Sequence, residues 1–160
     1  MSGSGTAFRR AGRQDVPAIV RLLADDQLGR TREVTAAGPE DLPASYWQAF
    51  EAIDADPRNL LVVAELQGQV VGTLQLTFIP SLTLVGGERA QIEAVRVDGH
   101  YRGQGLGGAM LRWAIEQARA RGCRLVQLTT DKRRPDALRL YRSLGFQATH
   151  EGLKLRLNDP

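Results

Sequence analysis

The residues best suited to chemistry lie in one segment, where a glycine-rich turn stands between an apolar stretch and an amphipathic one. Four glycines fall within six positions, at Gly103, Gly105, Gly107 and Gly108. Glycine lets the backbone approach a ligand closely and adopt a positive φ. The free N–H groups and the positive dipole end of a following helix favour an anion. Since Arg102 adds a formal charge, we interpret this segment as a site for a phosphate or pyrophosphate.

Two common phosphate-binding motifs fit this segment less well. A P-loop ends in Gly-Lys-Ser/Thr, whereas Gly107-Gly108-Ala109 supplies neither the lysine nor the hydroxyl. The dinucleotide fingerprint matches formally at Gly103-x-Gly105-x-x-Gly108, and Asp131 follows near the end of a later predicted strand. Too few residues remain after Asp131 for the rest of a doubly wound sheet. A dinucleotide-binding oxidoreductase therefore stays only as a distant alternative.

The spacing Arg102-x-x-Gly105-x-Gly107 resembles the acetyl-CoA loop of the GCN5-related N-acetyltransferase (GNAT) family, which has the form Gln/Arg-x-x-Gly-x-Gly/Ala. A later motif of that family, Tyr-x-x-x-Gly-Phe, is found at Tyr141-x-x-x-Gly145-Phe146. Residues 60–157 match the family's order of elements, and residues 8–23 match in pattern only. The resemblance implies an α/β fold of one domain, with a mixed, mostly antiparallel sheet flanked by helices.

The resemblance also implies acetyl-CoA as co-substrate and an N-acetyltransferase activity. The strand that ends at Val97 would splay from its neighbour and pair with the pantetheine arm, and the Val95 N–H would bind the thioester oxygen. Arg134 stands where the family often has an asparagine that contacts the pantetheine arm; either Arg134 reaches a phosphate of the cofactor instead, or this contact is absent. The full set of expected cofactor contacts is Val95, Arg96, Val97, Arg102, Gly103, Gln104, Gly105, Leu106, Gly107, Gly108 and Arg134.

Two residues are predicted to be catalytic. Glu93, a carboxylate in an otherwise apolar strand, would act as general base on the ammonium group of the substrate, directly or through a water. An ion pair with Arg89 or Arg96, or simple surface exposure, is the alternative. Tyr141 would donate a proton to the departing CoA thiolate, because a phenol pKa of about 10 lies near that of a thiol. The alternative for Tyr141 is packing alone.

The remaining candidate groups receive plainer predictions. His100 is expected to be a surface loop residue without a partner carboxylate, and Cys123 a small buried filler without a neighbouring base. Substrate selection should come from the polar stretch after the first helix. There Asp25 and Asp26 could hold a cationic amine, while Arg30 and Arg32 could hold a carboxylate.

Apolar periodicity and turn residues predict the elements that position these groups. Asp15 stands where the cap of the first helix belongs, and Gly122 and Gly145 stand where two later helices should end. The predicted helices are 16–23, 45–55, 106–121 and 135–144, and the predicted strands are 8–11, 60–66, 70–78, 90–97, 125–130 and 152–157.

Composition limits the class of protein. The chain has 160 residues, a net charge of +3, one cysteine and two histidines. These values predict one domain over residues 8–157 after a disordered head at 1–7, no disulfide and no metal site. No apolar run could span a membrane, no secretory signal opens the chain, and no basic block suggests nucleic acid.

We therefore predict a cytoplasmic N-acetyltransferase that uses acetyl-CoA and acts on a primary amine of a small molecule or peptide. The amine would attack directly in a ternary complex, with no covalent enzyme intermediate. A CoA-binding regulatory module without turnover is the alternative from another class, and a homodimer remains an open option for the assembly.

Overall fold

The protein is described by a computed structural model covering residues 5–26 and 28–158. Residues 1–4 of the predicted head lie outside the described part. The chain divides into two compact units, residues 1–127 and 128–160, which are described in turn.

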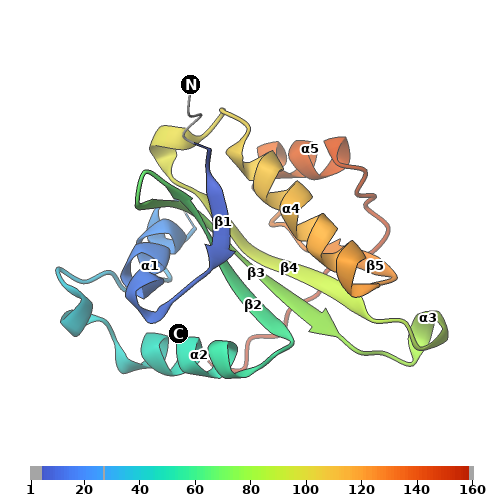
Figure 1. Ribbon diagram of the computed structural model, residues 1–160, viewed down its shortest axis with the longest axis horizontal. Coiled ribbons are helices and arrows are strands. Elements are labelled where there is room, and N and C mark those ends of the chain that lie inside the picture. Colours follow the sequence, from blue (N-terminus) through green and yellow to red (C-terminus); the bar gives the residue numbers. More distant parts are fainter. Residues whose placement is uncertain (1–4, 27, 159–160) are drawn as a thin grey trace. The chain divides into compact units, whose positions relative to one another are not determined.

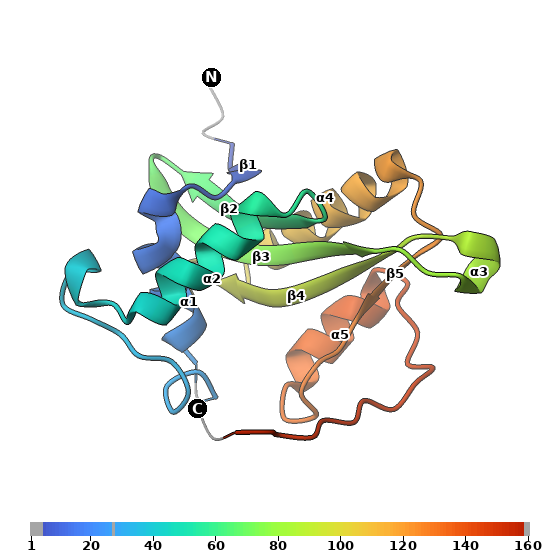
Figure 2. The same ribbon diagram turned by 90° about the horizontal axis from the view of Figure 1, so that it is seen from below.

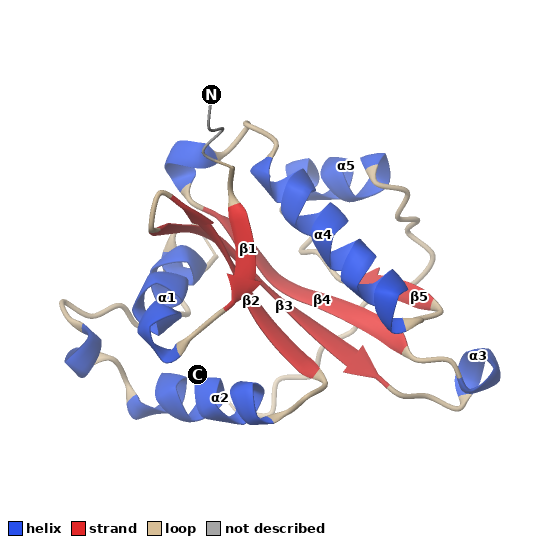
Figure 3. Ribbon diagram, in the orientation of Figure 1, coloured by secondary structure: helices blue, strands red, loops and turns tan. Residues whose placement is uncertain are grey.

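The first unit is built on a sheet with the strand order β1-β2-β3-β4-β5 (Figure 1). Neighbouring strands from β1 to β4 are antiparallel, and β5 lies beside β4, where Gln127 donates a hydrogen bond to Gln91. The turn at Gln67 and Gly68 has the positive φ angles of a tight hairpin, 50° and 78°. The strands are β1 (Ala7–Arg10), β2 (Asn59–Leu66), β3 (Gln69–Ile79), β4 (Arg89–Val97) and β5 (Leu125–Leu128), drawn in red in Figure 3.

Helices cover both faces of this sheet. The first unit contains α1 (Val16–Ala24), α2 (Ala44–Ala55), α3 (Thr83–Gly86) and α4 (Leu106–Arg121). Figure 2 shows α3 at the far end of the β3–β4 hairpin, where Leu82 and Val85 are 97% exposed. The predicted bounds of α4 agree with the structure, because a glycine with a left-handed φ stands at each end, Gly105 at 84° and Gly122 at 83°.

Successive side chains of β2 point to opposite faces of the sheet, and a different helix covers each face. Val63 points to the α1 face and packs with Ala11 and Ile19. Its neighbour Ala64 points to the α4 face, opposite Gly72 of β3. At Gly72 a Cβ would come within 2.7 Å of the Met110 Sδ, so only glycine lets α4 pack this closely.

A second cluster fixes α2 against α1. It contains the buried residues Val16, Val20, Leu42 and Phe50, with Tyr46 and Trp47 packed partly against it. Burial of such side chains is the main stabilising term of the fold. The aromatic residues of α2 are thus packing residues here, as their helical spacing indicates.

The second unit contains one helix, α5 (Pro135–Ser143), in its described residues. Pro135 lies in the first turn, and Gly145 follows the helix with a φ of 94°. The prediction of a strand at 152–157 is wrong, because the structure has no strand there. The side chains of Leu153, Leu155 and Leu157 are 93, 86 and 84% exposed. Their alternation has the period of a strand, but a strand also needs a partner for its backbone groups.

Candidate active site

A bulge interrupts β4 at the predicted site. Thr73 of β3 pairs with Arg96, and Gln75 pairs with Glu93, so Ala94 and Val95 together oppose a single residue of β3. Ala94 has a φ of 54°, a left-handed conformation that is unfavourable for any residue with a Cβ. A bulge bends its strand and leaves the extra residue without a ladder partner. Neither Ala94 nor Val95 has a partner in the β3 register.

Glu93 stands directly before this bulge and is exposed. Among the described residues none forms an ion pair with Glu93, so the predicted alternative of a pair with Arg89 or Arg96 is not observed. The Arg96 Nε lies 3.3 Å from the Asp26 Oδ2 instead, and the Arg96 Nη1 donates to the Val95 carbonyl at 2.9 Å. Exposure of Glu93 agrees both with access for a substrate and with the alternative of a surface residue, so its role as a base stays a prediction.

Arg102 connects the loop after β4 to the end of α1. Its Nε donates to the Val97 carbonyl at 3.1 Å, and its Nη2 donates to the Asp25 carbonyl at 2.9 Å. The Asp25 carboxylate lies 3.5 Å from the same nitrogen. These contacts show that the guanidinium also holds the loop in place, a function that the sequence motif alone does not indicate.

His100 lies on the surface of this loop, as predicted, but it has a carboxylate partner that was not expected. Asp98 accepts hydrogen bonds from the His100 backbone N–H and contacts the His100 Nδ1, both at 2.9 Å. The backbone hydrogen bond is the main cause that lowers the pKa of Asp98. The Asp98 side chain caps the short 3-10 turn at Gly99–Tyr101. The His100 side chain is 93% exposed, so this pair lies on the surface.

The glycine-rich turn leads directly into α4. Gly103 and Gly105 have φ angles of 74° and 84°, and a Cβ built on either would meet no atom within 4 Å. The glycines are thus required by the backbone conformation, and open space lies beside them. In the described part of the chain, no side chain caps the N-terminus of the 16-residue helix that follows. Uncapped N–H groups at an open helix end are suited to an anion such as a phosphate.

Tyr141 and Arg134 belong to the second unit. The half-buried Tyr141 ring packs edge-on against Phe146, with the ring centroids 6.0 Å apart. Arg134 directly precedes α5, and its backbone N–H donates to the Asp131 carbonyl at 2.9 Å. Their predicted roles toward the cofactor stay predictions.

Cys123 is half-buried, and its thiol lies 3.8 Å from a Glu88 carboxylate oxygen. Burial is the main cause that raises the pKa of this thiol, and the Glu88 charge raises it further. A raised pKa disfavours the thiolate, so these surroundings do not activate Cys123 as a nucleophile.

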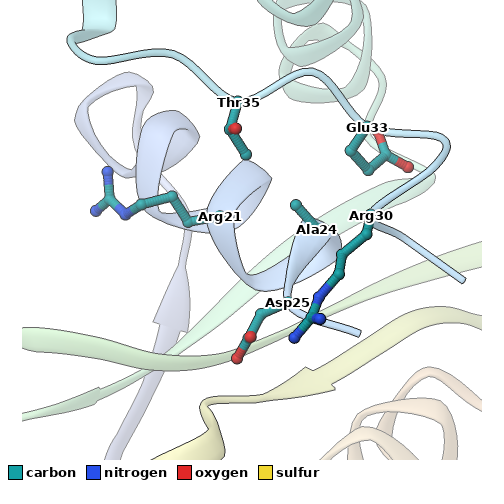
Figure 4. Close-up of a pocket in the computed structure, with 6 residues that line it drawn as sticks. All are labelled: Arg21, Ala24, Asp25, Arg30, Glu33 and Thr35. Carbon is teal, nitrogen blue, oxygen red and sulfur yellow. The ribbon is translucent and has the colours of Figure 1, made fainter. Parts of the chain in front are cut away.

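A cavity of about 300 Å³ opens beside the end of α1 (Figure 4). Asp25, whose carbonyl accepts from Arg102, contributes to its wall, so the cavity adjoins the glycine-rich loop. The residues that line it are Arg21, Ala24, Asp25, Arg30, Glu33 and Thr35. Of the carboxylates predicted to hold an amine, Asp25 pairs with Arg102 and Asp26 with Arg96. Each of these carboxylates therefore already has an arginine beside it.

A bulged strand that leads through a glycine-rich turn into an uncapped helix is typical of a site for a phosphate-bearing group, and an exposed carboxylate precedes the bulge. Comparison with known proteins identifies the class. A model of the Acetyltransferase (GNAT) family matches residues 21–146. The chain belongs to this family and is an acetyltransferase, as the two motifs predicted, and the dinucleotide-binding alternative is discarded.

Individual relatives agree with this assignment. Glucosamine 6-phosphate N-acetyltransferase of Trypanosoma brucei brucei is 37% identical over 142 residues, which cover 86% of this chain and 95% of that protein. An L-methionine sulfoximine/L-methionine sulfone acetyltransferase of Pseudomonas paraeruginosa is 30% identical over 88% of this chain and 80% of its own. A solved structure described as a transcriptional regulator from Bacillus halodurans C-125 has a TM-score of 0.91 and 50% identity, over 96% of this chain and 100% of that one.

Two further properties concern the described residues alone. None of their helices combines the length and apolar character that a membrane crossing requires. Their histidine, cysteine and acidic side chains form no group of three or more that could hold a metal ion.

Proposed function

We propose that this acetyltransferase moves the acetyl group of acetyl-CoA to the primary amine of a small molecule in a ternary complex. The carrying observation is the β4 bulge, where Ala94 and Val95 lack partners on β3 while the exposed carboxylate of Glu93 precedes them. The named relatives act on small amine-bearing molecules, which favours this class of acceptor over a peptide. On composition, we place the activity in the cytoplasm.

In this proposal the chain's own groups move protons and bind the developing charge. Glu93 accepts a proton from the substrate ammonium, directly or through a water, because only the neutral amine is nucleophilic. Acetyl-CoA supplies the thioester, whose C–S bond breaks as the N–C bond forms. The Val95 N–H stabilises the negative charge that develops on the carbonyl oxygen. Tyr141 gives its phenolic proton to the leaving thiolate, the nitrogen loses its second proton to solvent, and the phenolate regains a proton from solvent. The products are therefore an amide, CoA and one released proton.

The glycine-rich segment binds the co-substrate and does no chemistry. The N–H groups at the start of α4 and the residues from Arg102 to Gly108 would hold the pyrophosphate, as the family motif implies. Arg102 already uses two of its nitrogens on the Val97 and Asp25 carbonyls. Its larger contribution is therefore to hold the loop that presents these N–H groups.

A CoA-dependent regulatory function is the second candidate, and one observation favours it. The similar solved structure from Bacillus halodurans, 50% identical, is described as a transcriptional regulator. A regulator could bind acetyl-CoA in the same loop without turning it over. The two candidates therefore differ in turnover and agree on binding.

The test is release of free thiol from acetyl-CoA in the presence of a panel of primary amines. We expect at least one amine to be acetylated, with a rate that rises from neutral to mildly alkaline pH as the ammonium loses its proton. Glu93→Gln should lower kcat by about 10²–10⁴-fold, the usual contribution of a general base, and leave the Kd for acetyl-CoA unchanged.

Glu116→Gln is the matched control, because it removes an exposed carboxylate of α4 that, among the residues the structure describes, pairs only with its neighbour Arg119. It should leave the rate as it is. Tight binding of acetyl-CoA without acetylation of any amine would favour the regulatory candidate. Full activity and an unchanged pH profile in Glu93→Gln would mean that Glu93 is not the base.

A further inference from the structure

The charges around the cavity at the end of α1 are unevenly neutralised. Its two carboxylates are both engaged: Asp25 with Arg102, and Glu33 with the Arg32 guanidinium, whose Nε lies 2.5 Å from the Glu33 Oε1. The Tyr46 hydroxyl also donates to the other Glu33 oxygen at 2.8 Å. Its two guanidinium groups, on Arg21 and Arg30, form no ion pair with any described residue. The charge that remains to be satisfied is therefore positive.

We infer that this cavity holds an anionic group of the acceptor through Arg30 and Arg21, so that the preferred substrate is an amine that also carries a phosphate, phosphonate or carboxylate. The inference rests on the proposed function and adds to it the class of acceptor. A guanidinium suits these groups because its planar donors can form two parallel hydrogen bonds to their oxygens.

The two arginines approach the cavity differently. In Figure 4 Arg30 reaches along the cavity toward Asp25, whereas Arg21 extends away from Arg30 on the other side of the last α1 turns. Both side chains are exposed, so a change of rotamer is fast and inexpensive. Arg30 is thus placed to make the primary contact, and Arg21 to join it when an anion is bound.

The position of the cavity suits an acceptor subsite. Asp25 in its wall accepts a hydrogen bond from Arg102, and Asp26, next in sequence, pairs with Arg96 directly after the bulge. A substrate anchored by its anionic end in the cavity would therefore have its other end close to the C-terminal part of β4. A volume of about 300 Å³ is at the lower end of the range for ligand pockets, which suits a small molecule.

The experiment compares acceptors that share an aminoethyl chain and differ only at the other end: phosphoethanolamine, β-alanine and ethanolamine. Glucosamine 6-phosphate and glucosamine form a larger matched pair. With wild type, we expect kcat/KM to be at least about tenfold higher for one or more anionic members than for the neutral partner, as one charge-assisted contact provides. The phosphate and carboxylate arms show which anion the cavity prefers.

Arg30→Ala should reduce the preference for the anionic acceptor about tenfold by raising the KM for that acceptor. Arg21→Ala should reduce the preference by a smaller factor. Activity on the neutral partner and the KM for acetyl-CoA should not change. Arg119→Ala, which deletes an exposed guanidinium of α4 outside the cavity, is the matched control and should keep the full preference. High salt should weaken the preference in wild type, because an open charged contact is screened.

Equal kcat/KM for anionic and neutral acceptors, or a preference that survives in the double variant Arg21→Ala/Arg30→Ala, would overturn the inference and leave the proposed function intact. If no amine is acetylated, the proposed function fails instead. In that case, calorimetric titration with glucosamine 6-phosphate tests the anion subsite without turnover. Binding to wild type that is lost in Arg30→Ala would support the subsite, and absence of binding to wild type would overturn it.

Discussion

The packing of Tyr141 and its proposed proton transfer depend on different atoms of the same side chain. Its ring packs against Phe146 at the end of α5, while the proposed proton transfer needs only the hydroxyl. Removing the hydroxyl and removing the ring should therefore have different consequences.

We expect Tyr141→Phe to lower the turnover number by about 10²–10⁴-fold, the usual contribution of a general acid. The Tm should fall much less than in Tyr141→Ala, which also loses the edge-on contact with Phe146. A thioester with a thiol of lower pKa should partly restore the rate of Tyr141→Phe, because a better leaving group needs less protonation. An unchanged turnover number on acetyl-CoA would leave Tyr141 as a packing residue.

Among single residues, the sequence identified candidates by type but not by their partners. Glu93 was recognisable as the single carboxylate of its strand, and it is exposed beside the bulge. Asp25 and Asp26 were assigned to an amine, yet they face Arg102 and Arg96 across long sequence separations. Such contacts depend on how the chain folds back on itself, and local spacing carries no signal for them.

At the scale of elements, patterns with local causes were predicted well. The helix at 106–121 follows from its apolar period and the glycines at its ends. The β4 bulge was missed, because alanine carries no signal for a left-handed φ and only the β3 register creates the extra residue. The strand predicted at 152–157 failed for the related reason that alternation does not supply a pairing partner.

The first helix shows a further difference between pattern and contact. Asp15 was predicted as a cap, but its side chain forms no capping hydrogen bond to α1. It accepts hydrogen bonds from Arg9 of β1 and from the Gly12 N–H, and Arg9 also reaches Glu65 of β2. The carboxylate therefore connects β1 to the start of α1.

This connection should make the stability depend on pH. The hydrogen bonds from Arg9 are the main cause that lowers the pKa of the buried Asp15 below its ordinary value of about 3.9. A lowered pKa stabilises the folded state above pH 4 and ceases to do so as the pH falls through the folded-state value. Asp15→Asn should therefore lower the free energy of unfolding by about 1–3 kcal/mol at pH 7, and the difference from wild type should shrink toward pH 3.

Urea unfolding at pH 7, 5 and 3 measures this difference. Asp54→Asn is the control, because Asp54 pairs with Arg10 at the surface and is 52% exposed. Exposed pairs contribute little, so its effect should be near zero at every pH. A difference between Asp15→Asn and wild type that is constant with pH would show that the Asp15 charge is not what stabilises this connection.

For the whole molecule, binding of acetyl-CoA should appear as stabilisation of the fold, because a ligand bound only by the folded state shifts the unfolding equilibrium. At 100 times Kd the gain is about 2.7 kcal/mol, or about 5–10 °C in Tm for a chain of this size. The absence of a shift at millimolar acetyl-CoA would contradict the assignment of the cofactor.

The same measurement can show whether the glycine-rich turn provides the binding site. Gly105 and Gly122 stand at opposite ends of α4 with φ angles of 84° and 83° and open space beside each, so replacement by alanine should cost both about 1 kcal/mol of stability. Only Gly105→Ala should also reduce the Tm shift caused by acetyl-CoA, since it disturbs the turn that presents the N–H groups of α4 to the pyrophosphate. Acetyl-pantetheine lacks the pyrophosphate, so its affinity should be nearly equal in the two variants. Equal loss of acetyl-CoA binding in both variants would mean that the substitution acts through the stability of α4 and that the pyrophosphate lies elsewhere.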